Sequence, residues 1–232
     1  MLAPDKKFIQ EAFDSITPRY DLLNQILSFG MSEKWRERSA KILLSDINFS
    51  PKTVLDLGCG TGKFLECFLR SKSWESATGV DFSVAMLQKA RATVRSGNVM
   101  WLREDFDALP FLESSFDLVI SGFTLRSAQH LPRFLATVHR ILTPGGKAAF
   151  LDLTRPRALW ARILFYPYLR FVLPLLGWLI SGKRKAYGFL SGSVRQFQAP
   201  EETIRLMQAA GYRDCTSKSF AFGAATLIIG KK

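Results

Sequence analysis

A glycine-rich segment flanked by two acids is the part of the sequence that points most directly to chemistry. Gly58, Gly60 and Gly62 alternate with other residues just after a short apolar run that contains Asp56. A second apolar run follows and ends at Asp81. Glycines in such a turn let the backbone approach a ligand closely, and the second acid can accept hydrogen bonds from ribose hydroxyls. The pattern therefore predicts a nucleotide-binding strand–helix–strand unit.

The glycine spacing distinguishes two kinds of nucleotide ligand. A dinucleotide site carries G-x-G-x-x-G and sets a helix N-terminus against a pyrophosphate. Residues 58–62 instead read G-x-G-x-G, and this spacing after an aspartate resembles the motif of the S-adenosylmethionine (SAM)-dependent methyltransferases. The resemblance implies SAM as the cofactor, and a dinucleotide such as NAD is the alternative interpretation of the same turn.

The elements that must position this turn alternate along the chain. Apolar runs predict strands at residues 53–57, 77–81, 99–103, 116–121 and 147–153, and amphipathic patterns predict helices at 63–71, 83–95 and 131–142. Ser83 is expected to cap its helix, and residues 143–146 are expected to form a turn. Pro200 opens a last helix to residue 209. Two final strands at 213–220 and 224–229 must pair antiparallel, because too few residues separate them for a crossover.

Helical patterns also precede the first strand. Residues 5–16 and 20–29 are expected to be helices separated by Pro18, which a helix interior does not tolerate. Ser32 is expected to cap a third helix that ends near residue 44.

No repeat or linker divides the chain. We therefore expect one domain over residues 1–232, with N-terminal helices at 1–45 and an insertion at 154–199.

Composition indicates a globular protein of a reducing compartment. The chain has 232 residues and is 47% hydrophobic, which excludes global disorder. Its three cysteines, Cys59, Cys67 and Cys215, have no metal-binding spacing. The first residues lack the apolar core of a signal peptide. We expect a cytoplasmic protein without a metal site.

Residues 154–199 carry most of the excess positive charge. The formal net charge is +12, and no acid lies between Asp152 and Glu201. That interval holds eight basic residues: Arg155, Arg157, Arg162, Arg170, Lys183, Arg184, Lys185 and Arg195. It is also rich in aromatic and aliphatic residues, but Arg162, Arg170 and two prolines interrupt the stretch that could otherwise span a membrane.

A basic surface with many apolar side chains suits the headgroup region of an anionic membrane. Nucleic acid is the rival partner, and the high aliphatic content argues against it, because nucleic-acid grooves combine charge with a few stacking aromatics. The remaining alternative is a lid that packs these side chains internally. We expect peripheral association with the inner face of the cell membrane.

Motifs along nearly the whole chain are similar to those of the ubiquinone/menaquinone biosynthesis C-methyltransferases. They comprise residues 13–24 (with Tyr20-Asp21-x-x-Asn24), 27–30, 35–36, 108–111, 123–126, 142–146, 186–194 and 200–202. The chain departs from this family in two places. Cys59 stands where the family commonly has glycine, and residues 122–127 read Gly-Phe-Thr-Leu-Arg-Ser where the family commonly has Ser-Phe-Gly-Leu-Arg-Asn.

The resemblance implies an α/β fold, the Rossmann-like class I methyltransferase fold. Its seven-stranded, mostly parallel sheet has the strand order 3-2-1-4-5-7-6 and ends in a C-terminal antiparallel hairpin. An N-terminal helical preface precedes the sheet, and a helical cap precedes the last helix. The ligand is expected at the carboxyl ends of the first, second and fourth strands.

The cofactor residues carried over from the family surround the turn. The resemblance places Asp105 near the adenine amino group and Phe106 against the adenine ring, whereas a plain loop acid and a core side chain are the alternatives. The full expected set is Asp56, Gly58, Gly60, Thr61, Asp81, Phe82, Asp105, Phe106 and Gly122.

The expected chemistry is methyl transfer to a ring carbon. A quinone ring is electron-poor, but the reduced quinol can attack once a hydroxyl is deprotonated. Arg126 could stabilise the oxyanion, and His130 could act as general base or be a surface residue. The resemblance makes Tyr20, Asn24, Arg126 and Tyr187 candidates for binding the substrate, with Tyr20, Arg126 and His130 as catalytic candidates.

Three functions remain open from the sequence. The first is C-methylation of a prenylated quinol, with demethylmenaquinol to menaquinol as the expected conversion. The second is SAM-dependent methylation of another membrane-resident substrate, such as a phospholipid headgroup. The third is a SAM-binding module without turnover. The sequence leaves open the naphthoquinol or benzoquinol ring and whether the chain forms a homo-oligomer.

Overall fold

The strands of the protein form one seven-stranded sheet. A computed structural model describes residues 17–95, 98–105, 109–128, 130–154, 156, 159–172, 175 and 199–232. Its strands are β1 (Thr53–Leu57), β2 (Ser76–Asp81), β3 (Val99–Arg103), β4 (Phe116–Gly122), β5 (Leu142–Leu153), β6 (Arg213–Phe220) and β7 (Ala225–Lys231). The order across the sheet is β3-β2-β1-β4-β5-β7-β6. β1 to β5 pair in parallel, whereas β7 is antiparallel to both β5 and β6. This confirms the expected fold.

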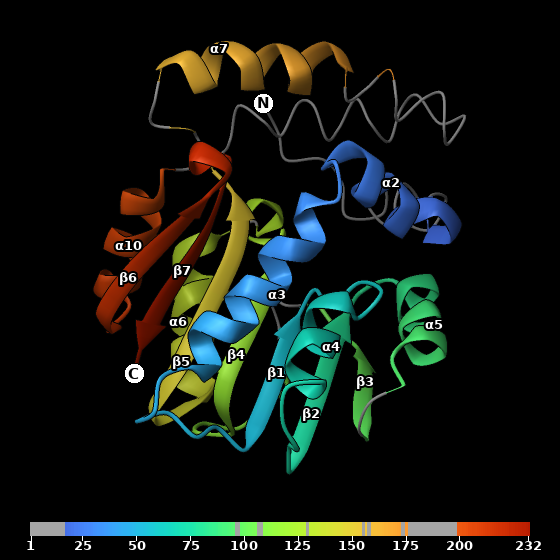
Figure 1. Cartoon of the computed structure of the whole chain (residues 1–232). Coiled ribbons are helices and arrows are strands. Elements are labelled where there is room, and N and C mark those ends of the chain that lie inside the picture. The colour runs from blue at the N-terminus through green and yellow to red at the C-terminus, as the bar shows by residue number, and fades with distance from the viewer. Residues whose placement is uncertain are drawn as a thin grey trace.

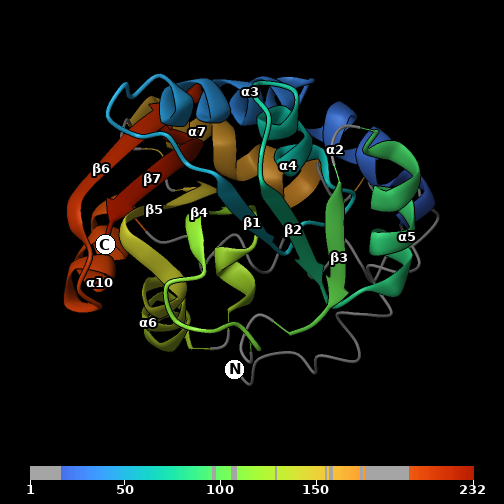
Figure 2. The same ribbon diagram turned by 90° about the horizontal axis from the view of Figure 1, so that it is seen from below.

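Helices cover both faces of the sheet. The helices of the described chain are α2 (Tyr20–Leu27), α3 (Met31–Leu44), α4 (Lys63–Leu69), α5 (Val84–Thr93), α6 (Leu131–Ile141), α7 (Leu159–Pro167) and α10 (Pro200–Ala209). Short turns are η1 (Thr17–Arg19), η2 (Leu125–Ser127), η3 (Tyr168–Val172) and η5 (Ala221–Gly223). Figure 1 shows α2 and α7 beyond the end of the sheet toward which β5 points. Figure 2 shows α3 and α4 over one face, with α6 and α10 over the other.

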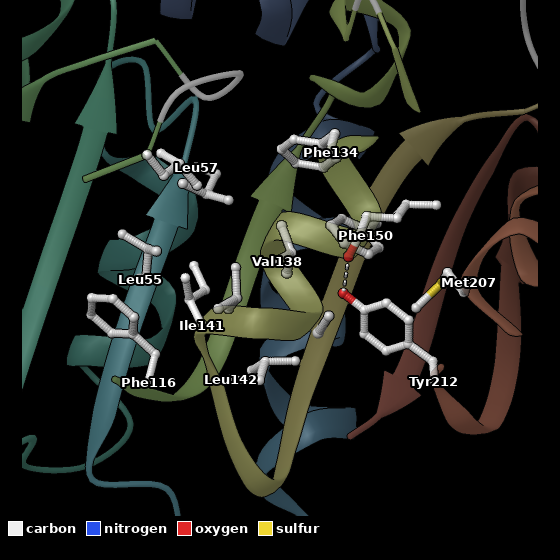
Figure 3. Packing of buried hydrophobic residues seen from close by; sticks show 14 of the residues in the cluster. Leu55, Leu57, Phe116, Phe134, Val138, Ile141, Leu142, Phe150, Met207 and Tyr212 are labelled. Carbon is white, nitrogen blue, oxygen red and sulfur yellow. Dashed lines mark hydrogen bonds between the residues drawn. The ribbon is translucent and has the colours of Figure 1, made fainter. Parts of the chain in front are cut away.

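Two buried clusters result from the alternation of side chains along the strands. Leu55 and Val119 pack on the face covered by α6 and α10, in the cluster drawn in Figure 3. Their neighbours Val54 and Leu118 pack on the opposite face against α3 and α4. Because successive residues of a strand point to opposite faces, a sheet covered on both sides needs apolar residues at nearly every strand position. The continuous apolar runs of the sequence meet this requirement.

Two local predictions were wrong. Ser32 does not cap α3, because the helix begins at Met31 and Gly30 is its N-cap. The Ser28 hydroxyl instead accepts a hydrogen bond from the Ser32 N–H at 3.1 Å. Residues 143–146 lie within β5 rather than before it. They shift the pairing register between β4 and β5, from Phe116–Leu142 to Leu118–Lys147. The Thr143 hydroxyl donates a hydrogen bond to the Asp117 carboxylate at 3.0 Å. The Ser83 cap is confirmed by a 3.2 Å hydrogen bond from the Met86 N–H.

The expected cap is helical where the structure describes it. α7 ends at Pro167 because proline has no N–H to continue the hydrogen-bonding pattern, and the π-helical turn η3 follows. Most of the rest of the cap and the helix expected at residues 5–16 lie outside the described residues. Within the described part of the chain, no helix combines the length and the hydropathy needed to cross a membrane.

Candidate functional site

The glycine-rich turn lies where the order of the parallel strands reverses. β1 is followed in the chain by β2 on one side, whereas its other neighbour in the sheet is β4. Open α/β sheets bind ligands at this switch point, beyond the carboxyl ends of the strands. The Cys59 N–H donates to the Val80 carbonyl at 2.9 Å and so fixes the start of the turn against β2.

Two glycines of the turn are required for different reasons. Gly58 has φ +67°, and a Cβ on it would lie 2.3 Å from Cγ2 of Thr124. Gly60 has φ +54°, but a Cβ there would meet no atom of the described residues within 4 Å. Gly58 is therefore closed by the end of β4, whereas Gly60 opens on free space in which a ligand can approach the backbone.

Asp81 organises the turn from the end of β2. Its side chain is buried, with 6% of the residue exposed. One carboxylate oxygen accepts from the Gly60 N–H at 2.8 Å and the other from the Ser83 N–H at 2.9 Å. An ionised carboxylate offers about four acceptor sites, and these two contacts occupy two of them. Asp81 therefore links the turn to the start of α5.

Burial isolates the carboxyl group of Asp56 from solvent. Asp56 is 1% exposed, and within the described part of the chain no donor meets hydrogen-bonding geometry at either carboxylate oxygen. The pKa of Asp56 is raised to about 8, chiefly by burial; the backbone N–H of Leu65 and the charge of Arg36 act to lower this pKa, and the charge of Asp81 acts to raise it. A buried carboxylate in this state is an acceptor for a cationic or hydrogen-bond-donating ligand. The ammonium group of SAM has that chemistry, so the residues present fit this cofactor.

Arg36 and Phe123 lie on the same side of the sheet as Asp56. The Arg36 guanidinium lies 5.2 Å from the centre of the Phe123 ring, and Trp35 packs 6.5 Å from the same ring. Phe123 has φ +62°, which is unusual for a residue with a side chain. Its N–H donates to the Leu151 carbonyl at 2.7 Å. This conformation turns the chain out of β4 and into η2, where Arg126 is located.

The other expected cofactor residues lie in the turn itself or at the ends of β2, β3 and β4. Thr61 is buried in the turn, and Phe82 follows β2. Asp105 is half-buried two residues after β3. Gly122 ends β4, and a Cβ there would lie 3.1 Å from Cδ1 of Phe64. A side chain at this departure from the family pattern would therefore require Phe64 to shift slightly. Phe106 lies outside the described residues.

The expected substrate residues come from separate segments. Tyr20 and Asn24 are half-buried on α2, four residues apart and so on one side of the helix. Arg126 belongs to η2 immediately after β4, but its side chain lies outside the described part. His130 is exposed at the N-cap of α6. Tyr187 lies outside the described residues.

One contact of the turn was missed from the sequence. The Thr61 hydroxyl donates to the Asp21 carboxylate at 2.7 Å, and the Lys89 ammonium lies 3.0 Å from the other oxygen of that carboxylate. Asp21 lies in a motif that resembles the family, and as a charged residue beside Tyr20 on an amphipathic helix it could have been singled out. Nothing in the sequence indicates that its partners are Thr61 and Lys89.

Comparison with protein families identifies relatives of the entire chain. The model of the ubiE/COQ5 methyltransferase family matches residues 1–232. The ubiquinone/menaquinone biosynthesis C-methyltransferase UbiE of Desulfotalea psychrophila is 34% identical, over 97% of this chain and 90% of the relative. The demethylmenaquinone methyltransferase of Deinococcus radiodurans is 37% identical, over 97% of this chain and 92% of the relative.

Solved structures share the fold at lower sequence identity. The methyltransferase in complex with the Trm112 methyltransferase activator from Haloferax volcanii superposes with a TM-score of 0.68 and 19% identity. The match covers 94% of this chain and 96% of that one. At this identity the likeness establishes the class I methyltransferase fold and nothing about the substrate.

Proposed function

The chain belongs to the ubiE/COQ5 methyltransferase family, and on that premise we propose that it methylates a ring carbon of a prenylated quinol with SAM as methyl donor. It is a SAM-dependent methyltransferase enzyme. We propose demethylmenaquinol as the substrate and menaquinol as the product. The names of the two relatives support a quinone-pathway substrate.

One structural observation supports the cofactor part of this proposal. Asp56 is buried beside the glycine-rich turn, and no donor of the described residues meets hydrogen-bonding geometry at its carboxylate oxygens. Leaving a buried carboxylate unsatisfied costs free energy, and a bound cationic group removes that cost. The open space at Gly60 lies in the same turn. Both features suit an aminoacyl nucleoside better than a dinucleotide, because a pyrophosphate offers neither a positive charge nor a hydrogen-bond donor to the carboxyl group of Asp56.

In this proposal the cofactor is held by the glycine-rich turn and by residues at or after the ends of β2, β3 and β4. Asp56 accepts from its ammonium group, Asp81 from its ribose hydroxyls and Asp105 from its adenine amino group, while Phe106 packs against the adenine. Gly58, Gly60, Thr61, Phe82 and Gly122 shape the pocket. SAM supplies an electrophilic methyl group on a sulfonium, so the protein needs to orient the reactants and exclude water.

The remaining residues act on the quinol. Arg126 stabilises the oxyanion that forms when a quinol hydroxyl is deprotonated, which raises the electron density of the adjacent ring carbon. Tyr20, Asn24 and Tyr187 bind the quinol, and His130 is the candidate general base. His130 is exposed at the start of α6, so it serves as base only with the quinol bound close to that helix end.

We also propose that the enzyme works at the inner face of the cell membrane, where a prenylated substrate resides. Exposed apolar residues support this proposal, because Trp160, Ile163 and Phe171 on α7 and η3 are each at least half exposed. The Trp160 ring packs 4.8 Å from Phe222 of η5, which is 73% exposed. The acid-free interval around α7 supplies positive charge for anionic headgroups.

Quinone analysis tests the substrate. Cells that lack the protein should accumulate a demethylated prenyl quinone, and its ring identifies a naphthoquinol or benzoquinol substrate. In vitro, the purified enzyme is offered a prenylated demethylnaphthoquinol and a phospholipid with labelled SAM. Label in the quinol alone supports the proposal. Label in the phospholipid alone, or SAM binding without turnover on either substrate, contradicts it.

A further inference from the structure

Asp21 connects the helix proposed to bind substrate with the turn proposed to bind cofactor. It lies on α2 between Tyr20 and Asn24, and its carboxylate contacts two other segments. The Thr61 hydroxyl of the turn donates to one oxygen at 2.7 Å. The Lys89 ammonium of α5 lies 3.0 Å from the other. The two contacts reach the segments that follow β1 and β2, two of the strands whose carboxyl ends form the proposed cofactor site.

A further bond strengthens this connection. The Lys89 ammonium also donates to the Thr17 carbonyl at 3.0 Å, which fixes η1 at the start of α2. The Asp21 and Lys89 side chains are only 21% and 23% exposed, so the ion pair is largely removed from solvent. Breaking such a pair leaves an uncompensated charge in a partly desolvated place. The helix therefore has a defined position relative to the turn.

Two acids accept hydrogen bonds from adjacent residues of the turn. Asp81 accepts from the Gly60 N–H, and Asp21 accepts from the hydroxyl of the next residue, Thr61. A ligand that changes the position of the turn must therefore act on α2 through Thr61. The same α2 carries Tyr20 at its first position and Asn24 one turn later.

We infer that Asp21 is a positioning residue that couples cofactor binding to quinol binding, by holding α2 to the glycine-rich turn through Thr61 and to α5 through Lys89. The inference rests on the proposed function, because the two ligands are those proposed above. Coupling between two sites is reciprocal in binding free energy. With α2 held to the turn, each ligand is expected to raise the affinity for the other by the same factor, and the loss of Asp21 is expected to remove this effect.

Calorimetry tests the coupling with unreactive ligands. The Kd of S-adenosylhomocysteine is measured with and without a saturating short-chain 1,4-naphthoquinone. In the wild-type protein the quinone should lower this Kd by about fivefold or more. In Asp21→Ala the Kd without quinone should change little, whereas the quinone should lower it by less than about twofold. The kcat for a short-chain quinol should fall in the same variant.

Matched variants separate positioning from general stability. Asp46→Ala breaks another lysine–aspartate ion pair, with Lys147 at 2.5 Å, in the loop before β1 at the opposite end of the sheet. It should preserve the coupling even where it lowers the melting temperature. Lys89→Met should weaken the coupling and Lys89→Arg should restore it, which keeps the test valid if Asp21→Ala fails to fold.

The outcomes distinguish this inference from the proposed function. Equal coupling in the wild type and in Asp21→Ala overturns the inference and leaves the proposed function intact. An active wild-type enzyme that shows no coupling has the same two consequences. A wild-type enzyme that binds S-adenosylhomocysteine but methylates no quinol overturns the proposed substrate. Equal loss of coupling in Asp46→Ala and Asp21→Ala assigns Asp21 a purely structural role and overturns the inference.

Discussion

The methyl group of Thr124 occupies the space that a side chain on Gly58 would need, since a Cβ on Gly58 would lie 2.3 Å from Cγ2 of Thr124. The Thr124 hydroxyl is also hydrogen-bonded to Ser121 at 2.5 Å, and Ser121 donates to the Leu57 carbonyl at 2.7 Å. The end of β4 therefore supports the glycine-rich turn directly. In the family that the chain resembles, glycine commonly stands at position 124, so this support depends on a departure from the family pattern.

Gly58→Ala should lower SAM affinity for two reasons. The alanine meets Thr124, and it must also adopt φ near +67°, which costs a residue with a Cβ about 1–2 kcal/mol. Adding Thr124→Gly removes the clash but leaves the backbone cost. The double variant should therefore recover part of the SAM affinity lost in Gly58→Ala, as measured by calorimetry. Identical affinities for the single and double variants would rule out the contact as the cause.

SAM affinity should depend on pH through Asp56. Burial raises the pKa of Asp56 to about 8 in the ligand-free protein, so the acid is mostly protonated at neutral pH. Binding a cationic group requires the ionised form. Affinity should therefore rise by up to about tenfold per pH unit toward pH 8, and it should fall again at higher pH as the ammonium group of the ligand loses its proton. In Asp56→Asn the affinity should be lower and this dependence absent; a flat profile in the wild type would contradict the assignment.

The same pKa predicts how stability varies with pH in the absence of ligand. Between the ordinary value of 3.8 and about 8, Asp56 binds more protons in the folded than in the unfolded state. Its contribution to the free energy of unfolding is therefore largest below pH 4 and declines as pH rises through this window. Asp56→Asn should flatten this part of the stability profile in denaturant titrations at several pH values.

Asp81→Ala should reduce SAM affinity at least about tenfold. The change removes the acceptor for the ribose hydroxyls in our proposal and also the acceptors for the Gly60 and Ser83 N–H groups. Asp117→Ala is a matched control, because Asp117 also accepts from two backbone N–H groups, those of Lys52 and Thr53. That control should lower stability without changing SAM affinity. Unchanged affinity in Asp81→Ala would refute this position for the ribose.

Arg126→Lys should lower kcat with little effect on SAM affinity. Lysine keeps the positive charge but loses the planar arrangement of donors that can hold an oxyanion. Arg133→Lys, an exposed arginine on α6, serves as the control and should behave like the wild type. A parallel loss of SAM binding and turnover in Arg126→Lys would assign Arg126 to the cofactor pocket or to structural support.

Membrane binding should depend on the aromatic pair at the start of α7. The double variant Trp160→Ser/Phe222→Ser removes two exposed rings that contact each other at 4.8 Å. It should bind anionic liposomes several-fold more weakly in co-sedimentation, because apolar burial and charge both contribute to interfacial binding. Ile47→Ser, at a residue 95% exposed in the loop before β1, is the control for lost surface hydrophobicity. Liposome binding unaffected by the double variant would exclude this surface.

Local sequence determined the elements of the fold. Thr53–Leu57, Val99–Arg103 and Arg213–Phe220 are strands with the predicted bounds, since apolar periodicity and turn residues act over a few positions. The strand order followed from the family resemblance. Ser32 was assigned wrongly because serine is a good cap wherever the backbone presents free N–H groups, whereas the helix here begins after Gly30 and the Ser28 hydroxyl accepts from the Ser32 N–H.

The sequence by itself determined the glycine-rich turn, its two acids and the strands that carry them, because all of these lie within about thirty residues of one strand–helix–strand unit. Only the tertiary structure decided that Asp56 is buried, that Thr124 closes Gly58 and that Asp21 meets Thr61 and Lys89. Asp21 and Thr61 are 40 residues apart in the chain. Such contacts depend on how α2 and α5 pack at one end of the sheet, and local propensity carries no information about that packing.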